Sequence, residues 1–182
     1  MPLEWNFWYA LWMIQDGLPN RSVGDQFSWD IEFHSPEKLS ISEERRKTNI
    51  PLADYEYEII GEIISIYRAA SVAESACVID IGLKIIGDPD SLPVASKPGD
   101  YVRGKMSLSL THGHAIPPQE SAESLKRKWR VKAIKADVTP YISPPDRPNY
   151  FVRDRSRVAY KPVWSTAEVQ VENYILHCSE VL

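Results

Sequence analysis

A basic stretch around one tryptophan contains the residue types that could bind a nucleic acid. It runs Lys126-Arg-Lys-Trp-Arg-Val-Lys-Ala-Ile-Lys135, and Tyr150, Arg153 and Arg155 follow it. In proteins that bind single strands, cations contact the phosphates while aromatic rings stack on the bases. The same lysines and arginines would also suit the wet face or the edge of a sheet, where charge prevents unwanted pairing. The candidate binding residues are Trp129, Arg130, Lys132, Tyr150, Arg153 and Arg155.

Two histidines, in His112-Gly-His114, are the candidate metal ligands. On an extended chain this spacing places both imidazoles on one side, as a metal site in a barrel requires. The pair resembles the His-x-His of cupins, with Glu120 as a third ligand. Glu120 lies beyond Pro117-Pro118, and His177 is the one later histidine. We therefore expect no bound metal and no cofactor, and we keep a metal-dependent barrel enzyme using His112 and His114 as the third hypothesis.

Other patterns of enzyme chemistry are missing or have simpler explanations. The sequence has neither Gly-x-Ser-x-Gly nor a glycine-rich phosphate loop. Cys77 opens an apolar run, where a thiol stays protonated, and Cys178 would point to the opposite face of a strand from His177. Asp80 and Asp100 could be paired carboxylates, but a wet strand face for Asp80 and a turn for Asp100 explain them better. We therefore expect a protein that is not an enzyme.

Two segments begin with the same turn and continue as alternating strands. In each, a Gly-Asp pair fits a turn, and apolar and polar residues then alternate with a period of two. The pattern predicts that Phe27, Trp29, Ile31 and Phe33 face a core while Asp30 faces water. A duplicated half-barrel and a coincidental use of one turn both explain the likeness. The segments are Ser22-Val-Gly-Asp-Gln-Phe-Ser-Trp-Asp-Ile-Glu-Phe33 and Lys97-Pro-Gly-Asp-Tyr-Val-Arg-Gly-Lys-Met-Ser-Leu108.

Further alternating runs predict a mainly β protein. We expect strands at 55–67, 77–86, 101–111 and 129–138, with a bend or bulge at Gly61 and a bulge near Ile134. A last pair of strands is expected at 158–164 and 169–177. The order resembles the five-stranded OB-fold over about half the chain, with Tyr-Glu-Ile-Ile-Gly-Glu-Ile and Val-Ile-Asp-Ile-Gly-Leu as its first two strands. This resemblance implies a small antiparallel barrel, and a sandwich is the alternative. We expect Ile79, Ile81, Met106 and Leu108 in the core.

The N-terminal segment gathers five aromatic residues within eight positions. Trp5, Trp8 and Trp12 would share a helical face, whereas Trp5, Phe7 and Tyr9 would share a strand face. Periodicity alone does not decide between them. The cluster could belong to the core or could form a patch that faces a partner.

Length and charge limit the general class of the protein. The 182 residues suit one domain, and we divide it into an N-terminal segment (1–50), a barrel-like centre (55–138) and a proline-rich loop with C-terminal strands (139–182). Two cysteines are too few for a disulfide framework, and the aromatic N-terminus does not match a secretory signal or a membrane span. We therefore expect a cytoplasmic protein.

The formal net charge of −4 conceals an uneven distribution. Residues 1–120 carry 10 Lys and Arg against 18 Asp and Glu, a net −8, whereas residues 121–182 carry 11 against 7, a net +4. Small acidic domains without motifs resemble bacterial immunity proteins in general character. We therefore expect a non-enzymatic protein that occludes a protein partner, one with a basic face, and no membrane contact. The alternative is an OB-like module that binds single-stranded nucleic acid.

Overall fold

The computed structural model describes residues 4–71, 74–110, 116–118, 120–145, 147 and 149–181, and it is mainly β, with 50% strand and 7% helix. The strands are β1 (Glu4–Ala10), β2 (Gln26–Trp29), β3 (Ile31–His34), β4 (Ser40–Ile41), β5 (Thr48–Ala53), β6 (Glu56–Tyr67), β7 (Ala76–Asp80), β8 (Lys84–Gly87), β9 (Tyr101–Leu110), β10 (Arg127–Asp137), β11 (Tyr141–Ile142), β12 (Val152–Arg153), β13 (Tyr160–Val163) and β14 (Asn173–Glu180). The helices are α1 (Leu11–Gln15), α2 (Ala122–Leu125) and the 3-10 helix η2 (Pro89–Ser91).

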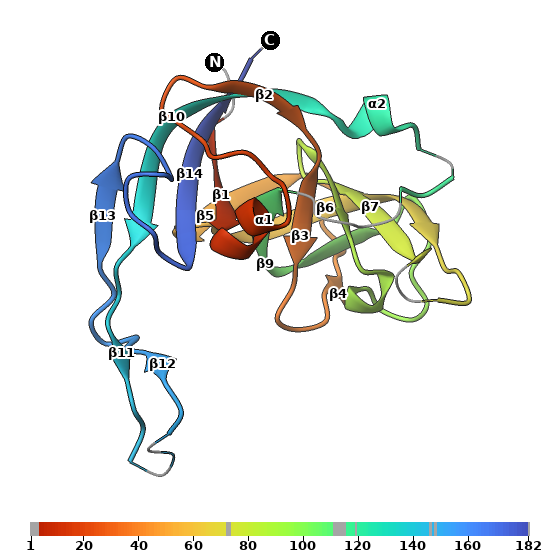
Figure 1. Cartoon of the computed structure of the whole chain (residues 1–182). Coiled ribbons are helices and arrows are strands. Elements are labelled where there is room, and N and C mark those ends of the chain that lie inside the picture. The colour runs from red at the N-terminus through yellow and green to blue at the C-terminus, as the bar shows by residue number, and fades with distance from the viewer. Residues whose placement is uncertain are drawn as a thin grey trace.

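Five strands close into a small barrel in the order β9-β3-β8-β7-β6, and β6 pairs with β9 to complete it (Figure 1). The expected mainly β fold with a small barrel is therefore confirmed. The barrel is mixed rather than purely antiparallel, because β3 and β8 run parallel. The segment expected as one strand at 77–86 is a hairpin, β7 and β8. Its turn forms because the Asp80 carboxylate accepts a hydrogen bond from the Gly82 N–H at 2.8 Å.

The two Gly-Asp turns have the same local structure. Gly24 and Gly99 have positive φ values of 95° and 88°, a conformation that costs other residues steric strain. The Asp25 carboxylate accepts the Ser22 N–H at 2.7 Å, and the Asp100 carboxylate accepts the Lys97 N–H at 3.0 Å. The turns predicted at both Gly-Asp pairs are therefore confirmed, but each Asp carboxylate bonds the N–H three residues before it rather than the backbone two residues after it.

The strand after the first turn is broken at Asp30. β2 pairs with β10, whereas β3 pairs with β9 and β8, so the chain passes from one sheet region to the barrel at this residue. The prediction that Asp30 faces water is wrong, because its side chain lies where the chain crosses over and is only 9% exposed. Of the expected core residues, Phe27 and Trp29 are half-buried, and the others are buried: Ile31, Phe33, Ile79, Ile81, Met106 and Leu108.

A second group of strands extends the sheet beyond the barrel in the order β13-β10-β14-β1, and β1 joins β9 (Figure 1). The predicted bulge in β10 is present, between Val131 and Ala133. The segment 129–138, expected as a barrel strand, is β10 and lies outside the barrel. The strands that pair with β9 in the barrel are β3 and β6. The two C-terminal strands expected to pair with each other instead flank β10 on either side, since its two edges pair with β13 and β14.

The N-terminal aromatic segment is a strand followed by one short helix. Trp5, Phe7 and Tyr9 on one face of β1 are at most 2% exposed and belong to a core that continues from the barrel into the second group of strands. Trp8 and Trp12 lie on the outer side, and Trp12 is 42% exposed. The core interpretation is therefore correct for the strand face. Within the described part of the chain, none of the helices has the length and apolar character needed to cross a membrane.

Candidate functional site

The tryptophan of the basic stretch is inside the protein. Trp129 is fully buried, its ring packs edge-on against Phe7 with centroids 4.9 Å apart, and its Nε1 donates to the Trp29 carbonyl at 3.3 Å. Trp129 therefore contributes to the core, and its ring is not presented to a nucleic-acid base.

The other predicted binding residues lie in two separate places. Arg130 and Lys132 are exposed on β10, while Tyr150 and Arg155 are exposed beyond the far end of that strand. Arg153 forms ion pairs with Asp137 and with Glu172, the latter at 3.5 Å. The structure does not gather these six residues into one site.

The histidine pair, His112 and His114, lies outside the described residues. Its proposed companion Glu120 pairs with Lys84 at 3.1 Å and accepts a hydrogen bond from the Ser124 hydroxyl at 3.1 Å. Within the described ranges, no group of three or more His, Cys, Asp or Glu side chains is arranged to hold a metal ion. The expectation of no metal stays a prediction.

The cysteines and the two candidate carboxylates have structural surroundings. Cys77 and Cys178 are buried thiols, and burial raises the pKa of each to about 12. Asp80 pairs with Lys47 at 2.7 Å, and Asp100 closes its turn. At neutral pH the thiols are protonated and therefore poor nucleophiles.

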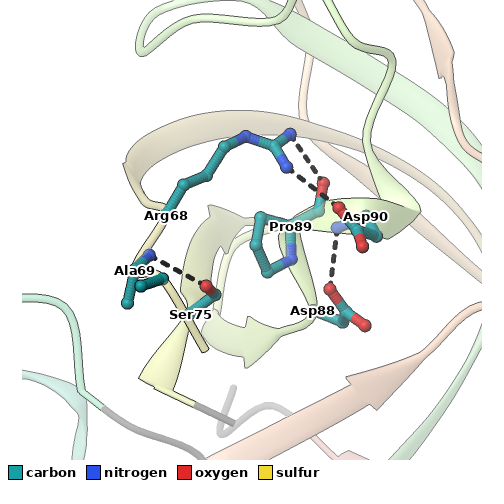
Figure 2. A pocket seen from close by; sticks show the side chains of 7 residues that line it. Arg68, Ala69, Ser75, Asp88, Pro89 and Asp90 are labelled. Atoms are coloured by element: carbon teal, nitrogen blue, oxygen red, sulfur yellow. Dashed lines mark hydrogen bonds and ion pairs between the residues drawn. The ribbon is translucent and has the colours of Figure 1, made fainter. Parts of the chain in front are cut away.

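A small polar pocket of about 230 Å³ lies beside η2 (Figure 2). Arg68 donates to the Asp90 carboxylate at 2.9 Å and to the Pro89 carbonyl at 3.1 Å. Asp88 accepts the Asp90 N–H at 2.7 Å, and the Ser75 hydroxyl accepts the Ala69 N–H at 2.9 Å. The polar groups of this pocket bind one another, which ties the end of β6 to η2.

A groove on the outer face of β1, β9 and β3 has more capacity for a ligand. The strand register places Trp8 beside Ser109, and Ser109 beside Glu32. Two residues further along β3, His34 lies opposite Ser107. The side chains of Trp8, Glu32, His34 and Ser107 alternate with buried ones and point outward, whereas Ser109 is itself only 7% exposed. A hollow of about 390 Å³ is lined here by Trp8, Glu32, His34, Tyr55, Ser107 and Ser109.

A second hollow, of about 290 Å³, has Trp8 as a wall that it shares with the first. Trp8 donates its Nε1–H to the Asn173 amide oxygen at 2.9 Å, which holds its ring between the two hollows. The second hollow is lined by Trp8, Leu11, Trp12, Gln15, Glu172 and Asn173. We call the two hollows together the aromatic groove.

Three aromatic rings follow one another along the aromatic groove. The Trp8 ring centroid lies 6.3 Å from that of Tyr55 and 6.2 Å from that of Trp12. Burial, followed by the nearby charges of Glu56 and Asp54, raises the pKa of Tyr55, so its phenol is protonated at neutral pH. The groove therefore combines flat apolar surfaces with hydroxyl, amide and carboxylate groups, the composition typical of a ligand site.

Sequence reasoning missed the aromatic groove because its residues come from segments far apart in the chain. The one available signal was in the N-terminal aromatic cluster. Trp8 and Trp12 occupy even positions there, so they do not share the strand face formed by Trp5, Phe7 and Tyr9. No family model, no curated protein and no solved structure matches this chain.

Proposed function

We propose that the protein is a non-enzymatic binding protein that occludes an extended, proline-containing and basic segment of a partner protein in the aromatic groove. The observation that carries this proposal is the row of Tyr55, Trp8 and Trp12 on the outer surface, with carboxylates in both hollows. Aromatic-lined grooves are a recurrent way of binding polyproline II segments, which are already extended before they bind.

The polar groups of the groove suit such a segment. A polyproline II chain has no internal hydrogen bonds, so its backbone groups can bond to Ser107 and Ser109 in one hollow and to Gln15 in the other. Glu32 in the first hollow would attract an arginine or lysine of the segment, whereas Glu172 in the second hollow already pairs with Arg153 of the same chain. This charge agrees with the basic partner expected from the net −8 of residues 1–120.

The test is fluorescence anisotropy with a labelled peptide of Arg-Pro-Pro repeats. We expect this peptide to bind, and we expect Glu-Pro-Pro repeats of equal length to bind less because they lose the charge attraction. Arg-Gly-Gly repeats should also bind less, because they are not extended beforehand. Equal binding of all three peptides would refute a site that selects basic polyproline segments.

Variants then locate the site. Trp12→Ala should weaken binding about tenfold, equivalent to about 1.4 kcal/mol, because aromatic side chains dominate such contacts. Trp164→Ala is the matched control, since Trp164 is also exposed (64%) but does not line the aromatic groove. Equal losses from the two variants would place the peptide elsewhere.

The nucleic-acid alternative is examined in the same assay with labelled single-stranded DNA and RNA. Phosphate contacts would lower the affinity by several decades between about 50 and 200 mM salt. We expect no tight binding at either salt concentration. Salt-sensitive binding that Arg130→Ala weakens would favour the OB-like alternative instead.

We also propose a cytoplasmic location, supported by the two thiols that the structure leaves unpaired.

A further inference from the structure

An arm formed by the described residues of 138–158 (138–145, 147 and 149–158) extends away from the rest of the protein (Figure 1). Within its described residues, a two-residue ladder joins Tyr141 to Arg153 and Ile142 to Val152. In the described part of the chain twelve large apolar side chains are exposed, and six of them lie in this arm. They are Val138, Tyr141, Ile142, Tyr150, Phe151 and Val158. Such a concentration of exposed apolar surface marks an interaction site.

The base of the arm is held in a fixed direction. Arg153 pairs with Asp137 at the end of β10 and, at 3.5 Å, with Glu172 before β14, while the Tyr141 hydroxyl donates to Glu172. These contacts supply the stability that a two-residue ladder lacks on its own. They direct the arm outward, so its distal residues Tyr150 and Phe151 are presented to another molecule.

The chemistry of the arm matches the aromatic groove. Its sequence contains four prolines between 140 and 148, and it carries four arginines against two aspartates, a net +2. Tyr150 and Phe151 are 57% and 65% exposed and could stack on the rings of the groove. The arm is thus a proline-containing, basic and aromatic segment, while the groove is aromatic and contains carboxylates.

The arm is also long enough to reach a neighbouring molecule. Ten extended residues span at most roughly 33 Å, comparable with the width of a small domain. Because each chain carries both an arm and a groove, two copies related by a twofold axis can each supply one to the other.

We propose that the arm of one copy docks in the aromatic groove of a second copy, so that self-association by arm exchange competes with the partner segment. This inference rests on the proposed function, since it uses the same groove. Self-association would keep the groove covered until a tighter-binding partner displaces the arm.

The test is sedimentation velocity at protein concentrations from about 5 to 500 μM, a range that spans weak association. We expect wild-type protein to become dimeric as its concentration rises. The arm variant, Tyr150→Ser with Phe151→Ser, and the groove variant, Trp12→Ala, should each stay monomeric. All three changes are at exposed side chains, and Trp164→Ala is the control that should dimerise like wild type.

Mixing the two variants is the decisive step. The arm variant retains an intact groove and the groove variant an intact arm, so a mixed pair has one productive contact and should associate where neither variant does alone. A wild-type protein that stays monomeric throughout, or a groove variant that dimerises normally, would overturn the inference.

Peptide binding separates this inference from the proposed function. If Arg-Pro-Pro repeats bind the arm variant while wild type stays monomeric, arm exchange is wrong and the groove function stands. If the peptide fails to bind the arm variant, whose groove is vacant, the proposed function is wrong, and arm exchange in the groove falls with it.

Discussion

Replacing Asp30 by asparagine should stabilise the protein at neutral pH. Among the described residues, Asp30 Oδ1 is one of a few buried polar atoms without a hydrogen-bond partner. A buried polar group left unsatisfied costs about 1–3 kcal/mol. Asparagine keeps a polar atom at this place but carries no charge, so the variant removes the extra cost of burying the ionised carboxylate. We expect a gain of about 1 kcal/mol, or about 2–4 °C in melting temperature for a domain of this size.

The pH dependence identifies the cause. Burial raises the pKa of Asp30, with Lys126 opposing and Glu123 reinforcing the shift. Its carboxyl is protonated in both folded and unfolded chains at low pH, so the penalty is absent there. The penalty develops as pH rises from the ordinary value of 3.8 through the raised folded pKa. The stability difference between Asp30→Asn and wild type should therefore grow across this window and then stay constant.

Thermal unfolding followed by circular dichroism between about pH 3 and 8 measures this difference. Asp154→Asn is the control with the opposite sign. Hydrogen bonds from Ser156 and from Arg157 lower the pKa of Asp154, so this variant should lose stability relative to wild type as pH rises. A stability difference for Asp30→Asn that is independent of pH, or that falls as pH rises, would refute the reasoning.

Three further predictions concern packing, thiol chemistry and the arm. Gly61→Ala should destabilise the protein by about 1–3 kcal/mol in urea unfolding, because the added methyl would lie 2.5 and 2.7 Å from methyl groups of two buried isoleucines; an unchanged midpoint would contradict this packing. Cys77 and Cys178 should not react with Ellman's reagent at about pH 8 in the folded protein but should both react in guanidinium, because burial raises their pKa to about 12. Arg153→Ala removes the ion pairs at the base of the arm, so limited chymotrypsin digestion after the exposed Tyr150 and Phe151 should be faster than in an Arg130→Ala control, and equal rates would show that these pairs do not hold the arm.

Local patterns in the sequence predicted much of the barrel. Turn chemistry at Gly24 and Gly99 acts within four residues, and strand alternation acts within ten, so both are visible without a fold. The break at Asp30 was not visible, because it depends on β2 and β3 choosing different partners. Likewise, nothing local specifies that both C-terminal strands flank β10.

The candidate site was harder to predict for the same reason. Trp129 and the lysines and arginines around it form a local pattern typical of nucleic-acid binding. The burial of the Trp129 ring, however, depends on Phe7, which is distant in sequence. The aromatic groove combines Trp8 from β1 with Tyr55 and with residues of β9 and β3. Only the strand register brings these side chains together.

The pairing of β1 with β14 affects how the protein must be made. Glu4 lies opposite Ser179, and Ala10 lies opposite Asn173, so β1 waits for a partner strand that is synthesised 163 to 175 residues later. At about 5–20 residues per second, that delay is roughly 10–35 s. Throughout it, the apolar face of Trp5, Phe7 and Tyr9 has no strand beside it on that edge. The first ten residues are therefore where we expect a chaperone to hold the nascent chain.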